Sequence, residues 1–144
     1  MLREIEESLT IVKMDSFTKE RPRTNFYTGA IYTPPKTLQR EKYIGQQFKL
    51  QNRTWRMADG PVSVEIEIEV NVPSSARKKE KEDMKVGLIY PTKKPDLDNV
   101  AKLVLDGLQG IAFNDDYQVV DLKVSKRYGE EKRLKIKVKR YEKI

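Results

Sequence analysis

The chain has 144 residues, of which 35% are charged and 38% hydrophobic, and its formal net charge is +7. It contains no cysteine and no histidine, which excludes disulfide bonds, thiolate or imidazole metal sites, cysteine nucleophiles and triads with an imidazole base. Any metal ion must therefore be held by oxygen atoms. The length suits one domain, which we place at residues 1–144, and no apolar run approaches the roughly 20 residues that cross a bilayer.

The positive charge is concentrated near the C-terminus. Residues 122–144 hold ten Lys or Arg and three Glu, so the rest of the chain is neutral in sum. A local excess of this kind favours a polyanionic partner such as nucleic acid. The N-terminal sequence MLREIEESLTIVK is too acidic and too poor in apolar residues for a signal peptide, and we therefore expect a cytoplasmic protein without membrane contact.

The first half of the chain predicts a strand, a loop, a helix and a second strand. Residues 9–14 have the composition of a strand, and the loop after them holds a short extended piece at residues 30–33, closed by two prolines. Residues 37–55 place apolar side chains near helical spacing, weakened by Gly45. Residues 62–72 alternate strictly between Val or Ile and polar residues, which predicts a half-buried strand.

The second half predicts a charged excursion, a helix and a hairpin. Residues 73–85 lack apolar periodicity and are expected to form a solvated helix or a mobile excursion, with a short strand at residues 85–90. Residues 117–126 and 132–141 predict a hairpin. Its inward side chains would be Val120, Leu122, Val124, Leu134, Ile136 and Val138. These elements predict an α/β (α+β) fold, a small, mixed, mainly antiparallel sheet with two helices on one face.

Residues 93–110, KKPDLDNVAKLVLDGLQG, predict an amphipathic helix that begins with two acidic residues. Asp96 stands where the helix starts, and Asp98 precedes Lys102 by one turn. The expected core face consists of Leu97, Val100, Ala101, Val104 and Leu108, with Leu105 at its edge and Leu103 off it. Two further acids, Asp115 and Asp116, follow the helix.

The acidic residues allow two interpretations. Carboxylates gathered closely repel one another unless a cation lies between them, and an all-oxygen set suits Mg²⁺ or Mn²⁺. Alternatively, Asp96 is a helix N-cap, Asp98 forms an ordinary surface pair with Lys102 worth roughly 0.3–0.5 kcal/mol, and residues 114–116 form a turn. Spacing alone does not decide between them.

The run KPDLDNVAKLVLDGLQGIAFNDDYQVVDLKV resembles the signature of the RusA family of Holliday junction resolvases, K-P-D-x-D-N-x-x-K followed by D-D-x-Q-V. Residues 21–37, RPRTNFYTGAIYTPPKT, resemble the upstream segment of that family. The resemblance implies a homodimeric, Mg²⁺-dependent endonuclease, with Mn²⁺ as a possible substitute, that nicks four-way junction DNA symmetrically during recombination and repair. It implies no small-molecule organic cofactor and is compatible with a prophage origin.

The resemblance also implies roles for individual residues. Asp96, Asp98 and Asp116 would be catalytic metal ligands, with Asp115 beside them, and Lys102 would stabilise developing charge or orient the attacking water. DNA contacts are expected from basic residues in or beside loops near the motif. These are Arg21, Arg23, Lys36, Arg40, Lys93, Lys94 and Lys126.

Two surface features have competing explanations. The outward lysines of the predicted hairpin could follow a DNA backbone, or could pair with Glu65, Glu67 and Glu69 of the earlier strand, which we favour. The loop aromatics Phe26, Tyr27 and Tyr32 could stack on splayed bases, although such residues more often anchor a loop onto the core.

Two rival functions belong to other classes. A non-catalytic DNA-binding module of the same fold would bind junctions without Mg²⁺-stimulated cleavage. A metal-dependent glycosyltransferase could use its D-x-D sequence to hold a nucleotide sugar, but 144 residues leave little room for a nucleotide-binding sheet and an acceptor pocket.

Overall fold

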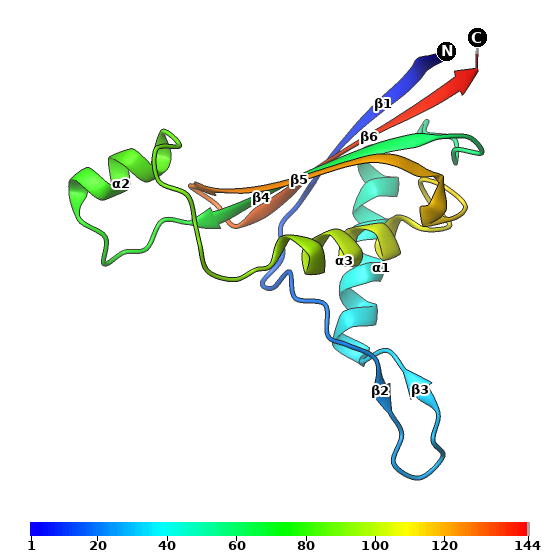
Figure 1. Ribbon diagram of the computed structural model, residues 1–144, viewed down its shortest axis with the longest axis horizontal. Coiled ribbons are helices and arrows are strands. Elements are labelled where there is room, and N and C mark those ends of the chain that lie inside the picture. Colours follow the sequence, from blue (N-terminus) through cyan, green and yellow to red (C-terminus); the bar gives the residue numbers. More distant parts are fainter. Residues whose placement is uncertain (144) are drawn as a thin grey trace.

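Four strands form the central sheet in the computed structural model, which describes residues 1–143. Their order across the sheet is β1 (Leu2–Val12), β6 (Arg133–Lys143), β4 (Val62–Asn71) and β5 (Val119–Gly129) (Figure 1). The pairs β1–β6 and β6–β4 are antiparallel, and β4–β5 is parallel. The predicted mixed, mainly antiparallel sheet is therefore confirmed.

The predicted hairpin is wrong, because β4 lies between β5 and β6. Ile66 of β4 is in register with Val124 on one side and with Ile136 on the other. Gly129 pairs with Asn71 and Arg133 with Glu69, so the short link between β5 and β6 passes the end of β4. A short connection normally joins neighbouring strands, so two strand patterns separated by a short turn predict a hairpin even where a third strand lies between them.

The position of β5 at the sheet edge also changes which side chains are buried. Leu134, Ile136 and Val138 of β6 are fully buried as predicted, because β6 has a strand on each side. On β5, Val124 packs against the core, whereas Val120 and Leu122 remain 63% and 43% exposed. Leu122 is in register with buried Val64, on the predicted inward face, but the sheet edge leaves it partly uncovered. The inward placement is wrong for Val120, which lies where the register with β4 shifts.

Helices α1 (Pro35–Gln51) and α3 (Leu97–Leu108) cover one face of the sheet and cross each other closely (Figure 1). A Cβ atom on Gly45 would lie 2.8 Å from the carbonyl oxygen of Gly107, and one on Gly107 would lie 2.8 Å from that of Glu41. Gly45 therefore does more than weaken the helix, since its missing side chain lets α3 approach.

The core face of α3 is wider than the predicted one. Val100, Ala101, Val104 and Leu108 are buried as expected, and Leu103, expected off that face, is fully buried as well. Leu97 is instead 39% exposed at the start of the helix. Packing against both α1 and the sheet requires apolar residues over more of the helix surface than one sheet contact does.

Strand β1 begins earlier than predicted because its acidic residues match a basic neighbour. Glu4 lies 3.1 Å from Lys139, Glu6 lies 3.1 Å from Arg140, and Glu7 lies 3.6 Å from Lys137. Ion pairs between β1 and β6 thus neutralise part of the C-terminal positive charge. Charged residues at alternate positions hide a strand from an analysis based on hydrophobic periodicity.

The predicted pairing of the β4 glutamates with outward lysines is found in part. Glu65 lies 4.0 Å from Lys123, and Glu69 lies 3.8 Å from Lys135. Lys137 and Lys139 pair with β1 instead. Ion pairs between neighbouring strands therefore neutralise lysines of β5 and β6 on this face of the sheet.

Two smaller elements lie outside the sheet. Helix α2 (Lys78–Lys85) confirms the solvated-helix prediction, but the strand predicted at residues 85–90 is wrong. The chain turns there, with the backbone N–H groups of Leu88 and Ile89 bound to the Asp83 carbonyl and Gly87 at a φ of 83°. Strands β2 (Arg23–Thr24) and β3 (Ile31–Tyr32) form a projecting hairpin (Figure 1).

Within residues 1–143, none of the helices combines the length and apolar character needed to cross a membrane.

Candidate active site

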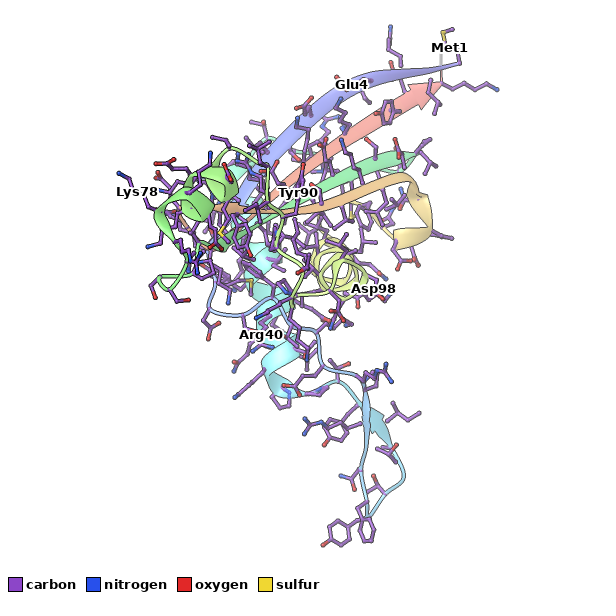
Figure 2. The ribbon with its side chains drawn as sticks, turned by 60° about the vertical axis from the view of Figure 1, so that its left-hand side comes forward. Met1, Glu4, Arg40, Lys78, Tyr90 and Asp98 are labelled. Carbon is purple, nitrogen blue, oxygen red and sulfur yellow. The ribbon has the colours of Figure 1, made fainter. Side chains whose placement is uncertain are left out.

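The N-terminus of α3 presents two carboxylates to solvent. Asp96 occupies the N-cap position, but its side chain makes no capping hydrogen bond, and Asp98 follows in the first turn. Both residues are exposed, and Asp98 lies on the side of α3 turned away from the four strands (Figure 2). Within residues 1–143, neither side chain forms an ion pair. The N-cap explanation therefore accounts for the position of Asp96 and not for its carboxylate.

The loop that leads into α3 is held by β5. Lys126 donates hydrogen bonds to the carbonyl oxygens of Lys93, at 2.5 Å, and Pro95, at 3.1 Å. The Lys94–Pro95 peptide bond is cis. Because these contacts use the Lys126 ammonium, its role here is to position the residue directly before Asp96.

The expected pair between Asp98 and Lys102 is not formed among residues 1–143. Lys102 Nζ instead lies 3.2 Å from Asp106 Oδ1 and 3.3 Å from Asp116 Oδ2. Lys102 thereby links α3 to the second acidic segment, which is far away in sequence. Since residues one helical turn apart are neighbours, Asp116 is brought to the same side of α3 as Asp98.

The ion pairs continue from Asp106 to a second lysine. Lys19 Nζ lies 2.7 Å from Asp106 Oδ2 and 2.8 Å from Glu41 Oε1. Together Lys19, Asp106, Lys102 and Asp116 form an alternating row of charges, which we name the Lys102 cluster. Asp106 therefore holds Lys102 from one side while Asp116 meets it from the other.

Contacts in the Lys102 cluster stabilise the charged forms of its members. The hydrogen bond to Asp106 raises the pKa of Lys102 against the smaller opposing effect of desolvation. The hydrogen bond from Lys102 is the main cause that lowers the pKa of Asp116. For Lys19, desolvation acts to lower the pKa, but hydrogen bonds to Asp106 and Glu41 outweigh it and raise the value. Lys19, Lys102 and Asp116 are consequently ionised at neutral pH.

Gln118 fixes the second acidic segment. It belongs to the 3₁₀ turn η1 (Asp116–Gln118), and its side-chain oxygen accepts hydrogen bonds from the backbone N–H groups of Asn114, at 2.8 Å, and Asp115, at 2.9 Å. Its side-chain nitrogen donates to the carbonyl oxygens of Ala58 and Gly60, both at 2.9 Å. The side chain thus ties Asp115 and Asp116 to the chain just before β4.

The residue types at this site suit a hard divalent cation. Carboxylate oxygens are the donors that Mg²⁺ and Mn²⁺ prefer, and two of the predicted ligands, Asp96 and Asp98, are not engaged by the fold. Across residues 1–143, however, no three acidic side chains are grouped closely enough to hold a metal ion. One oxygen of Asp116 is instead occupied by the Lys102 ammonium, which neutralises it from within the chain.

The predicted DNA-binding residues divide into three groups. Arg21 and Arg23 lie on the projecting hairpin, where Arg23 also pairs with Glu20 at 2.8 Å. Lys36 and Arg40 lie on the first turns of α1, and Arg40 donates to the carbonyl oxygen of Thr18 at 2.8 Å. The third group lies at the loop before Asp96, which contains Lys93 and Lys94 and is contacted by Lys126. Figure 2 shows that Arg40 and Asp98 lie on the same side of the sheet, between it and the projecting hairpin.

Sequence reasoning missed four residues that organise the site. Gln118 and Asn99 are letters of the quoted motif without an assigned role, and Asn99 accepts a hydrogen bond from the backbone N–H of Lys19 at 3.1 Å. Asp106 lies one turn after Lys102, so its helical spacing was a usable signal. Lys19 gave no signal, because its partners come from two separate helices.

Two comparisons with known proteins bear on this site. Residues 14–139 match the model of a family described as Endodeoxyribonuclease RusA. The chain is also 40% identical over 126 residues to the uncharacterized protein YqaN of Bacillus subtilis (strain 168), a match that covers 83% of this chain and 86% of that protein. The family match includes the start of α3, the Lys102 cluster and Gln118. The chain therefore belongs to the RusA family of endodeoxyribonucleases.

Proposed function

We propose that this protein is an Mg²⁺-dependent, structure-specific endodeoxyribonuclease that resolves four-way DNA junctions by paired symmetric nicks. Its setting would be recombination and repair in the cytoplasm. Mn²⁺ is the expected substitute ion. Two symmetric nicks need two equivalent sites, and we therefore propose a homodimer.

One observation supports this proposal above the others. Asp96 and Asp98 are exposed carboxylates without an ion-pair partner within residues 1–143, in a chain with a net charge of +7. Asp98 stands one helical turn before Lys102, which already contacts Asp116, and Asp96 is the N-cap of the same helix. A basic chain that leaves two neighbouring carboxylates unpaired has left them available to a ligand of opposite charge.

The proposed roles follow from these positions. Asp96, Asp98 and Asp116, with Asp115 adjacent, would hold the metal ion, which supplies a more acidic water and neutralises charge on the phosphodiester. Lys102 would place its ammonium against the scissile phosphate, where it stabilises negative charge that develops during cleavage. Asp106 would keep that ammonium in place, and Gln118 would keep Asp115 and Asp116 in place. Asp106 and Gln118 are positioning residues.

The test compares a synthetic four-way junction with a linear duplex of the same sequence, each with and without Mg²⁺. We expect paired nicks in the junction only when Mg²⁺ is present. Asp98→Asn should abolish cutting and spare junction binding, because the basic surface remains. Asp15→Asn, which changes another exposed aspartate, serves as the matched control and should cut normally.

Each alternative has its own outcome in this assay. Junction binding by the wild-type protein without cutting in Mg²⁺ or Mn²⁺ would identify a non-catalytic module. Normal nicking by Asp98→Asn would remove Asp98 from the proposed metal ligands. Sedimentation of an active monomer at the working concentration would contradict the homodimer.

A further inference from the structure

The hairpin of β2 and β3 extends from the body as an arm, residues 21–34 (Figure 1). Its strands pair at two positions, Arg23 with Tyr32 and Thr24 with Ile31. Every residue from 21 to 32 is exposed. The arm therefore contributes little to the core, and its function must lie in what it presents at its surface.

The tip of the arm is an ordered turn. The backbone N–H of Asn25 donates to the Ala30 carbonyl at 2.7 Å, and that of Gly29 donates to the Asn25 carbonyl at 2.9 Å. The Asn25 side-chain oxygen accepts from the N–H groups of Tyr27, at 2.9 Å, and Thr28, at 3.0 Å. Gly29 adopts a φ of 72°, which residues with a Cβ rarely adopt. These bonds fix the direction in which the tip side chains leave the backbone.

Two aromatic rings occupy this tip and face solvent. Phe26 is 91% exposed and Tyr27 is 93% exposed. Their ring centroids lie 5.5 Å apart with the rings perpendicular, so the two rings contact each other. The expectation that these aromatics anchor the loop onto the core is wrong for both. Adjacent exposed rings on a projecting turn mark an interaction site, because apolar surface of this size is unfavourable in water.

The charge around the rings selects the kind of partner. The arm contains two basic residues, Arg21 and Arg23, and no acidic residue, although Arg23 pairs with Glu20 at its base. Two further basic residues, Lys36 and Arg40, follow on the first turns of α1. A nucleic acid, as a polyanion, is attracted to an arm whose charged side chains are all cationic, whereas a second copy of a chain with net charge +7 gains no such attraction. Aromatic rings combined with cationic groups are the means by which proteins hold unpaired bases, since every base offers a face for stacking.

The base of the arm is fastened to the helix that carries the candidate site. The Lys19 backbone N–H binds the Asn99 side chain at 3.1 Å, directly beside Asp98, and the Lys19 ammonium binds Asp106 and Glu41. The Glu20 backbone N–H binds Thr37 Oγ1 of α1 at 3.0 Å. The arm therefore leaves the body from a point that is fastened beside the carboxylates of α3.

We propose that Phe26 and Tyr27 stack on bases that are unpaired or unstacked at the branch point of a DNA junction. This inference rests on the proposed function and adds the element that recognises the branch. Linear duplex offers no free base face, so the two rings discriminate between branched and linear DNA. Each ring contributes about tenfold to junction affinity, within the range found for base–aromatic stacking.

The test uses the full-length protein without Mg²⁺, so that DNA is bound and not cut. Binding is measured on a four-way junction carrying 2-aminopurine beside the branch point and on a matched linear duplex. The double variant Phe26→Ala/Tyr27→Ala should bind the junction roughly 100-fold more weakly, should bind duplex as the wild type does, and should lose the change in 2-aminopurine fluorescence. The variant Tyr27→Phe, which keeps the ring, should behave as wild type.

A matched control replaces exposed apolar residues elsewhere. Val86 and Leu88 are 71% and 73% exposed, and Val86→Ala/Leu88→Ala should leave junction binding unchanged. Unchanged junction affinity in the aromatic double variant, equal losses on junction and duplex, or loss of a dimer in sedimentation would each overturn the inference. The last result would assign the rings to a second copy of the chain. If wild-type protein prefers junctions and the aromatic variant keeps that preference, the inference fails while the proposed function stands.

Discussion

Two clusters of charged side chains in this protein use carboxylates in opposite ways. In the Glu69 cluster, formed by Glu69, Arg127, Arg133 and the adjoining Gly129, Glu69 is only 2% exposed. Arg133 binds it at 3.0 and 3.2 Å and Arg127 at 3.4 Å, while a Cβ on Gly129 would lie 2.6 Å from it. In the Lys102 cluster, the side chains remain partly exposed. The N-cap and first turn of α3 carry Asp96 and Asp98, which have no ion-pair partner within the described residues 1–143.

The difference separates a structural carboxylate from an available one. Glu69 is surrounded by cations of its own chain, so all its interactions stabilise the fold. Asp96 and Asp98 are left to solvent by the fold, so their charge can act on a ligand. The comparison predicts that changes in the Lys102 cluster alter activity with little effect on stability, and that changes in the Glu69 cluster do the reverse.

Lys102→Ala tests this contrast with the largest expected effect. We expect the single-turnover rate of junction cleavage to fall roughly 10²- to 10³-fold, or about 3–4 kcal/mol in the activation barrier, because one charge-stabilising donor is lost. The free energy of unfolding in urea should change by less than about 0.5 kcal/mol, since Asp106 keeps Lys19 as a partner. Lys123→Ala, which removes another exposed lysine, should change neither quantity. A stability loss in Lys102→Ala without a loss of rate would reverse the assignment.

Glu69→Ala should have the opposite outcome. Removing this buried carboxylate takes away the ion-pair partner of Arg133 and leaves Arg127 with Glu67 alone, at 2.7 Å. We expect the free energy of unfolding to fall by about 3 kcal/mol. The cleavage rate of the folded fraction should remain that of the wild type. Glu65→Ala is the control, because Glu65 is on the same strand but its side chain is 48% exposed. An equal loss in both variants would show that burial of Glu69 is not the cause.

Alternation of apolar and polar residues predicts where a strand lies in the chain, but it does not predict the order of the strands across the sheet. Residues 62–72 were assigned correctly because Val and Ile at every second position occur on a half-buried strand. The insertion of β4 between β5 and β6 depends on long-range pairing, for which a single sequence carries no local signal. The early start of β1 was missed because its partners, Lys137 to Arg140, lie at the other end of the chain.

The candidate site shows a similar division. The positions of Asp96 and Asp98 at a helix start could be predicted, since proline, spacing and amphipathicity define that start locally. The partner of Lys102 could not, because Asp98 and Asp106 both lie one turn away and the tertiary contact with Asp116 favours the C-terminal side. The clamp formed by Gln118 also depends on Ala58 and Gly60, which only the folded chain brings near.

Asp106→Asn sharpens the comparison within the Lys102 cluster. Lys102 would keep Asp116 but lose its second anchor, and we expect about a tenfold lower cleavage rate, equivalent to about 1.4 kcal/mol. Asp106→Glu should recover part of that rate, because a carboxylate is restored with a longer stem. Junction affinity should be unaffected in both variants, because Glu41 and Asn99 still hold Lys19 at the base of the arm. This separates positioning of Lys102 from DNA binding. Equal rates for Asn and Glu at position 106 would contradict an electrostatic role.

Acidification tests the Glu69 cluster with the smallest expected effect. Burial acts to raise the pKa of Glu69, but hydrogen bonds from Arg133 and Arg127 outweigh it and hold the pKa below its usual range. A lowered pKa contributes stability above the unfolded value of about 4.3, and this contribution is lost as pH falls through the folded value.

The measurement is urea unfolding of wild type and Glu69→Gln at pH 6 and pH 3. The other carboxylates titrate in both proteins, so the difference between the two isolates Glu69. We expect the wild-type advantage to shrink by about 1 kcal/mol on acidification, since protonation makes Glu69 resemble the neutral glutamine. A constant difference would mean that the arginines hold Glu69 by shape and hydrogen bonding, with no net preference for its charge.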